Sequence, residues 1–161
     1  MSGHVIYIAS PLGFSEVGRR FSHDVLLPSL RDAGYALLDP WSLTDRSRLD
    51  RVLAMPYGPQ RRDAWQRLNS EIGLTNRTAI DRADAVVAVL DGADVDSGTA
   101  AEIGYAFANG KLIVGYRGDL RQSGENEGGA VNLQVEYFVR ASGGTIVSMV
   151  PEIGRELKNR L

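Results

Sequence analysis

The chain contains no cysteine and only two histidines, His4 and His23. The lack of cysteine excludes disulfides, thiol catalysis and zinc–thiolate sites, and it is compatible with the cytoplasm, where we expect the protein to reside. One histidine lies near the N-terminus and the other falls within a helical pattern, which argues against a histidine metal site and against a Ser/His/Asp triad. We therefore expect chemistry that needs neither a metal nor another cofactor.

Excess charge of one sign and long apolar segments are also missing. The net charge of -2 gives no electrostatic reason to bind nucleic acid or a membrane surface. Residues 1–4 lead straight into a strand-like run, without the basic and apolar parts of a signal peptide. The 161 residues, of which 43% are hydrophobic, can bury a core without disulfides, so we expect a single domain over residues 1–161.

Short apolar runs alternate with helical patterns along the chain, which predicts an α/β fold with a five-stranded parallel sheet and helices on both faces. The expected strands are 5–9, 35–38, 85–90, 112–116 and 145–149. The expected helices are 15–34, bent at Pro28, then 61–82, 98–110, 131–140 and 151–161. Residues 44–59, with about one helical turn, and residues 117–129 are expected to be irregular surface segments.

The segment from Asp96 to Gly104 follows the apolar run 85–90, which is β-branched and too short for a helix. It therefore lies beyond the carboxyl end of a buried strand, where α/β proteins bind their ligands. Glu102 is expected in the first turn of the helix that Gly98 and Thr99 open. The positive end of that helix would favour an ionised carboxylate, which suits a nucleophile.

A structural role for Glu102 is the alternative, because Thr99 and Glu102 have the spacing of a capping box. Two features favour the functional interpretation. Three acidic residues crowd the preceding loop, namely Asp91, Asp94 and Asp96, and small residues such as Gly104 would let a ligand or another backbone approach the helix.

Several residues together carry a resemblance to the nucleoside 2-deoxyribosyltransferase family. They are Tyr7 in the first strand, the acidic loop with Asp96, the step Gly98-x-x-x-Glu102-x-Gly104-x-Ala106, Gly110-Lys111 before the next strand, and Asn132 after the polar loop. Their order extends over essentially the whole chain. The resemblance implies a flavodoxin-like, doubly wound sheet and a homo-oligomer, commonly a hexamer, whose substrates are 2-deoxynucleosides and free purine or pyrimidine bases.

The resemblance also implies catalytic roles. Glu102 would attack the anomeric carbon of the 2-deoxynucleoside, so that the base leaves and a covalent deoxyribosyl-enzyme awaits a second base. Asp96 would protonate or hydrogen-bond the base, and the hydroxyl of Tyr7 would hold Glu102 in position. The residues allow simpler interpretations as well: Asp96 as a helix cap, and Tyr7 as a core aromatic in a strand.

For substrate binding, the apolar side chains Leu12, Phe14 and Trp41 are expected to wall the pocket, with Gly98 beside them. Asn76 matches a position where some members of the family carry an aspartate that touches the base. An amide cannot protonate a base, so base preference stays open. Asn132 would reach the 5-hydroxyl of the sugar in a neighbouring subunit, and its alternative role is the N-cap of the following helix.

Two other functions remain open. Gly98-Thr99-x-x-Glu102 is similar to the core motif of phosphoribohydrolases, which cleave nucleoside monophosphates, although Val95-Asp96-Ser97 stands where those enzymes have Pro-Gly-Gly. The acidic loop would repel a phosphate, whereas Ser10, Ser15 and Arg19 could bind one at the opposite loop. The doubly wound fold alone would also permit a non-catalytic nucleotide-binding module, which would not need Glu102.

Overall fold

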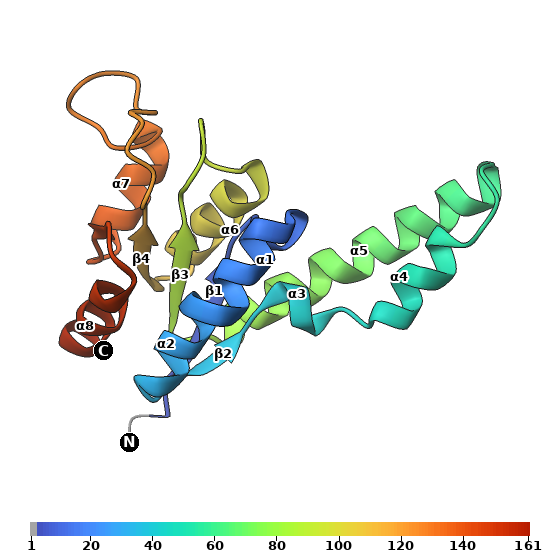
Figure 1. Cartoon of the computed structure of the whole chain (residues 1–161), viewed down its shortest axis with the longest axis horizontal. Helices are drawn as coiled ribbons and strands as arrows, with labels where there is room; N and C mark the ends of the chain where they lie inside the picture. Colours follow the sequence, from blue (N-terminus) through green and yellow to red (C-terminus); the bar gives the residue numbers. More distant parts are fainter. Residues whose placement is uncertain (1–2) are drawn as a thin grey trace.

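The computed structural model describes residues 3–161, so the first two residues of the N-terminal segment considered above lie outside it. Five parallel strands form one sheet in the order β2-β1-β3-β4-β5, of which Figure 1 labels β1 to β4. This is the flavodoxin-like order, which reverses between β1 and β3. The predicted fold class is confirmed, and the strands are β1 (Val5–Ala9), β2 (Ala36–Leu38), β3 (Ala85–Val89), β4 (Leu112–Tyr116) and β5 (Ile146–Val147).

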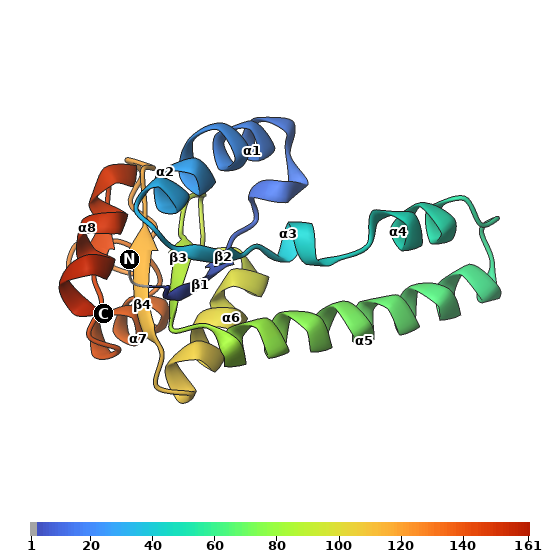
Figure 2. The same cartoon turned by 90° about the horizontal axis from the view of Figure 1, so that it is seen from below.

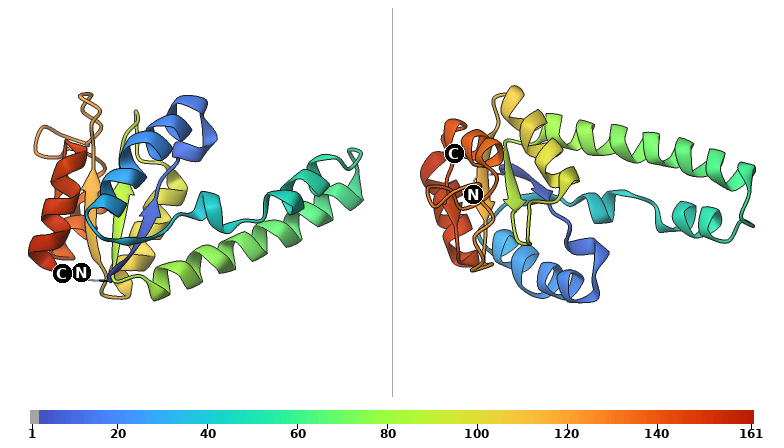
Figure 3. Two further views of the ribbon diagram at one scale, coloured as in Figure 1. Left: turned by 60° about the horizontal axis from the view of Figure 1, so that its bottom comes forward. Right: turned by 90° about the horizontal axis from the view of Figure 1, so that it is seen from above.

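Helices cover both faces of the sheet, as expected for buried parallel strands (Figures 1 and 3). One core cluster packs Val86 and Ala88 of β3 against α5 (Pro59–Arg82), α6 (Ser97–Ala108) and α7 (Leu133–Ala141). On the other face, Val87 and Val89 pack against α2 (Leu27–Asp32) and α8 (Val150–Arg160). Within residues 3–161, no helix is both long and apolar enough to cross a membrane.

The first helical segment differs in detail from the predicted bent helix. The 3-10 turn η1 (Leu12–Phe14) precedes α1 (Glu16–Phe21), which Ser15 caps by accepting a hydrogen bond from the Gly18 N–H. A π-helical turn, η2 (Ser22–Leu26), then leads into α2. Pro28 lacks an N–H for the carbonyl four residues earlier, and the wider turn just before it accommodates this gap in the hydrogen-bond ladder.

The prediction of only about one helical turn within residues 44–59 is wrong, because one helix takes up half of this segment. α3 (Pro40–Leu43) and α4 (Arg46–Leu53) precede α5, which begins at Pro59. Asp39 and Asp45 cap these two short helices, in which the apolar period is too brief to be recognised. Figures 2 and 3 show α4 running beside the N-terminal half of α5, away from the sheet. We call residues 44–72 the arm.

Candidate active site

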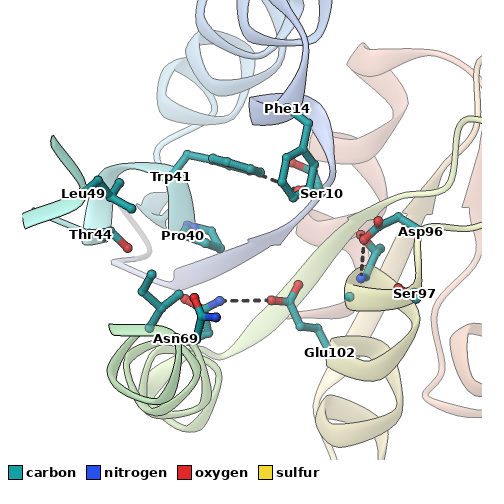
Figure 4. Close-up of a pocket in the computed structure, with 14 residues that line it drawn as sticks. Ser10, Phe14, Pro40, Trp41, Thr44, Leu49, Asn69, Asp96, Ser97 and Glu102 are labelled. Carbon is teal, nitrogen blue, oxygen red and sulfur yellow. Dashed lines mark hydrogen bonds between the residues drawn. The ribbon is translucent and has the colours of Figure 1, made fainter. Parts of the chain in front are cut away.

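A cavity of about 490 Å³ lies at the carboxyl end of β1 and beside the N-terminus of α6 (Figure 4). This edge is the β1/β3 switch point, where flavodoxin-like folds bind ligands, and the volume lies within the range of small-molecule sites, ~300–1,000 Å³. The lining residues come from the segment just after β1, from η1 and α3, from the arm and the rest of α5, and from the N-terminal part of α6: Ser10, Phe14, Pro40, Trp41, Thr44, Leu49, Asn69, Ile72, Asn76, Asp96, Ser97, Gly98, Thr99 and Glu102.

Glu102 does not occupy the first turn of its helix, and the capping-box interpretation is wrong. α6 begins at Ser97 with Asp96 as its N-cap, so Glu102 is the sixth helical residue. The Oδ2 atom of Asp96 accepts hydrogen bonds from the Thr99 N–H at 2.9 Å and the Thr99 hydroxyl at 3.2 Å. The helix end is therefore closed without Glu102, whose side chain is left available for another role.

The two carboxylate oxygens of Glu102 differ in their surroundings. The Tyr7 hydroxyl donates a hydrogen bond of 2.7 Å to Oε1, and the Asn76 Nδ2 donates to the same atom over a longer 3.5 Å. No hydrogen bond to Oε2 is present among the described residues. One oxygen thus fixes the orientation of the carboxylate, and the other is free to react.

Burial sets the protonation behaviour of this pair. Burial raises the pKa of the Glu102 carboxyl above its ordinary value; the hydrogen bond from Tyr7 opposes that rise, and the nearby Asp96 adds to it. The pKa of Tyr7 is also raised, first by burial and then by the charge of Glu102. Tyr7 is fully buried and therefore remains a protonated donor to Glu102.

The sequence suggested two roles for Asp96, as a helix cap and as a group that contacts the base, and its position is compatible with both. Its Oδ2 atom caps α6, as described above, whereas its Oδ1 atom has no hydrogen-bond partner among the described residues. Asp96 also lines the cavity, and a Cβ added at Gly98 would come within 3.1 Å of its Oδ2 atom. Capping and contact with a ligand are therefore compatible in this side chain.

Two aromatic side chains form the wall opposite Glu102, as Figure 4 shows. Phe14 and Trp41 meet edge to face, with ring centroids 4.6 Å apart, and the Trp41 Nε1 donates to the Ser10 carbonyl at 3.1 Å. A Cβ at Gly13 would lie 1.9 Å from the Trp41 ring, so only glycine lets the indole rest against η1. Leu12 is placed differently from the expectation: it packs on the core cluster of the other sheet face and is not among the lining residues.

One face of α5 forms a further wall of the cavity, with two amide side chains. The sequence analysis identified only one of its residues, Asn76. Asn69, Ile72 and Asn76 follow one another at helical spacing and all line the cavity. Two amides seven residues apart on one helix were the available signal. Without the course of the arm, however, the sequence did not indicate which face of this long helix meets the sheet.

Asn132 lies outside this cavity, and so do Asp91 and Asp94 of the acidic loop. The Asn132 Oδ1 accepts hydrogen bonds from the Gln134 and Val135 N–H groups, which makes it the N-cap of α7, and its Nδ2 donates to Glu125. Asp91 accepts from the N–H groups of Gly118 and Asp119. Gly104 faces Phe138 of α7, at ordinary contact distance, rather than a ligand.

The charge of the lining is one-sided. Asp96 and Glu102 are its two acidic residues, and the lining contains no lysine, arginine or histidine. Of the residues considered for phosphate binding, Ser15 caps α1 and Arg19 donates to the Gly13 carbonyl, whereas Ser10 lines the cavity. The cavity therefore suits a neutral ligand better than a phosphorylated one.

Comparison with solved structures finds the same fold in several proteins. A conserved protein from Enterococcus faecalis V583 matches with a TM-score of 0.73 and 26% identity over 99% of this chain and 100% of its own. A 2-desoxiribosyltransferase from Leishmania mexicana matches with a TM-score of 0.67 and 23% identity over 98% and 99% of the two chains. For the CMP N-glycosidase from Clostridium botulinum the values are 0.56 and 19%, over 98% and 99%.

Comparison with curated protein sequences gives no match. The model of one protein family, however, matches residues 6–134, a stretch that includes Tyr7, Asn76, Asp96, Glu102 and Asn132. This match covers most of the chain, and the structural relatives extend over nearly all of it. The chain belongs to the nucleoside 2-deoxyribosyltransferase family.

Proposed function

We propose that the protein transfers 2-deoxyribose between nucleobases through a covalent deoxyribosyl–Glu102 intermediate. The observation that carries this proposal is the Glu102 carboxylate, which has one oxygen held by Tyr7 and Asn76 and the other unpaired in the cavity. A nucleophile needs this combination of fixed orientation and a free reacting atom. A protein that only bound nucleotides would have no use for it.

The proposed reaction has two displacements at the anomeric carbon. Glu102 Oε2 forms a bond to C1′ while the C1′–N bond breaks, and its electron pair leaves with the base, which takes up a proton. Asp96 is the other ionisable group of the lining and serves as the donor. An acceptor base then attacks C1′, returns a proton to Asp96 and releases the Glu102 carboxylate, so the configuration is retained overall.

The walls of the cavity support transfer to a base. Phe14 and Trp41 offer flat apolar surfaces on which a base can stack, with only a few polar groups around them. A bound acceptor base would exclude water from C1′ and favour transfer over hydrolysis. The acidic lining, without a cation, favours nucleosides over nucleoside monophosphates.

Product analysis tests this proposal. The protein is incubated with 2′-deoxyadenosine and a second free base, and in parallel with 2′-deoxyadenosine 5′-monophosphate and the same base. We expect the exchanged nucleoside in the first mixture and at least about tenfold slower reaction in the second, because the phosphate would be placed near uncompensated carboxylates. Release of free base without exchanged product at saturating acceptor would favour a hydrolase, and no reaction of either donor would favour a binding module.

We further propose that the active form is a homo-oligomer, with a hexamer expected from the family resemblance, in which Asn132 serves the cavity of a neighbouring copy. Within one chain, Asn132 lies outside the cavity and caps α7. Replacing Asn132 by alanine should therefore cost about 1 kcal/mol of stability through the lost cap, and in addition lower exchange.

Subunit mixing separates these two effects. Inactive Glu102→Gln and weakened Asn132→Ala proteins, mixed under conditions that exchange subunits, should regain activity, because some shared cavities would combine two intact halves. Activity is measured before and after mixing, with subunit exchange checked by native mass spectrometry. A mixture that stays inactive, or a fully active monomer, would contradict the shared site.

A further inference from the structure

Trp41 is fixed in the cavity wall by contacts with the protein alone. Its backbone N–H donates to the Asp39 Oδ1 at 3.2 Å, its indole Nε1 donates to the Ser10 carbonyl at 3.1 Å, and its ring meets Phe14 edge to face. Figure 4 shows the indole directed toward Ser10. The side chain therefore has a defined position before any ligand enters the cavity.

The glycine at position 13 is explained by this indole and not by the backbone. Gly13 is not among the described glycines that have a positive φ, so its backbone conformation alone does not require glycine. A Cβ at this position would overlap the indole, with the Trp41 Cδ2 atom at 1.9 Å and the Cε2 atom at 2.3 Å. An alanine could therefore be accommodated only if the indole left its present place.

Asp39 is the one acidic residue in the buried class among residues 3–161, with a relative exposure of 4%. Burial of a carboxylate is unfavourable unless hydrogen bonds compensate for the lost water. Asp39 is the N-cap of α3, a helix of four residues that carries Trp41. Such a short helix has too few internal hydrogen bonds to be stable by itself. The cap therefore fixes where α3, and with it Trp41, lies after β2.

We propose that Gly13 and Asp39 are positioning residues for base recognition, which hold the Trp41 indole as a preformed surface for stacking. Neither residue lines the cavity, so both act through Trp41. This inference rests on the proposed function, because it takes a nucleobase as the ligand of the aromatic wall. A wall that is fixed in advance binds the base without first losing side-chain freedom, which strengthens binding. Glu102 lies across the cavity and is held by other residues, so its chemistry does not depend on this wall.

The kinetic test compares Gly13→Ala with Gly73→Ala. Gly73 lies on α5, and a Cβ there would meet no neighbouring side chain or other element within 4 Å. We measure kcat and the KM of adenine as the acceptor, at saturating 2′-deoxyinosine as the donor. Gly13→Ala should raise this KM roughly tenfold through the lost stacking and change kcat less than about threefold. Gly73→Ala should keep both values, and a lowered kcat with unchanged KM in Gly13→Ala would contradict the inference.

Two variants of Asp39 separate its cap from its charge. Asp39→Asn keeps an N-cap of equal quality, so it should keep the wild-type KM of adenine. Asp39→Ala removes the cap that positions α3 and should raise this KM severalfold, with little change in kcat. Equal losses in the two variants would contradict the capping role.

Fluorescence tests the position of the indole independently of catalysis. The chain has two tryptophans, so Trp41 is the single emitter in a Trp65→Phe background. In this background, Gly13→Ala should shift the emission to longer wavelength and increase quenching by acrylamide, because the displaced indole exchanges protein contacts for water. Gly73→Ala should change neither. Equal emission and quenching in both variants would overturn the inference while the proposed function stands. A wild type that transfers no deoxyribose would overturn the proposed function and the role in base recognition, even with the indole shown to be held.

Discussion

Replacing Glu102 by glutamine should reduce base exchange by at least about a thousandfold, because the change removes the carboxylate that we propose as the nucleophile. Glutamine has nearly the same shape, and its amide oxygen can still accept the hydrogen bond from Tyr7. Exchange is measured from initial rates of product formation. The matched control is Glu156→Gln on α8, where the glutamate pairs with Arg160 at the surface, and this variant should retain full activity.

The same substitution should not destabilise the protein at neutral pH. The pKa of Glu102 is higher in the folded protein than its ordinary value, because burial disfavours the charged form. The folded protein therefore favours the protonated carboxyl. As the pH rises through the raised pKa, Glu102 becomes charged and lowers the free energy of unfolding of the wild type. The melting temperature of Glu102→Gln relative to wild type should increase over this pH range. An active, destabilised variant would instead indicate a structural role for Glu102.

Replacing Asp96 by asparagine should lower exchange by roughly a hundredfold to ten-thousandfold, because the variant keeps the hydrogen-bonding shape but cannot transfer a proton. Asparagine is as good an N-cap as aspartate, so the hydrogen bond from the Thr99 N–H and the stability should persist. Initial rates and thermal unfolding are both measured. The control is Asp45→Asn, which alters the cap of α4 far from the chemistry.

Donors with different leaving groups refine this result. A base that is already a good leaving group needs less protonation, so its transfer should suffer less from Asp96→Asn than transfer of adenine. An equal loss for all bases would mean that Asp96 acts on the sugar or only on the shape of the loop. Unchanged exchange would leave Asp96 with the capping role alone.

The apolar runs predicted the five strands well, because the strands are short runs separated by helices of clear period, whereas the flavodoxin-like order of the sheet was expected from the family resemblance. β3 is buried along its whole length, which explains the uninterrupted apolar run that marked it. β5 is shorter than predicted, only Ile146–Val147, since a strand at the sheet edge pairs on one side. The helix carrying Glu102 started earlier than predicted, because aspartate and not threonine supplied its cap.

The candidate site could be predicted only in part, for a physical reason. Glu102, Asp96 and Tyr7 belong to strands and to a helix whose mutual placement the parallel sheet dictates. The positions of Asn69 and Leu49 depend on the path of the arm, which no local pattern reveals. Likewise, Leu12 packs against the core because the turn η1 directs it there, and its apolar character alone did not distinguish a core position from a cavity wall.

The arm contributes Thr44, Leu49, Asn69 and Ile72 to the cavity, but none of the groups that we assign to the chemistry. It is built from two helices that extend beyond the sheet and pack chiefly on each other. Changes in its sequence can therefore remodel one part of the cavity while β1 and α6, which hold Tyr7 and Glu102, stay as they are. Under the proposed function, the range of accepted bases can thus change, in evolution or in the laboratory, independently of the capacity for transfer.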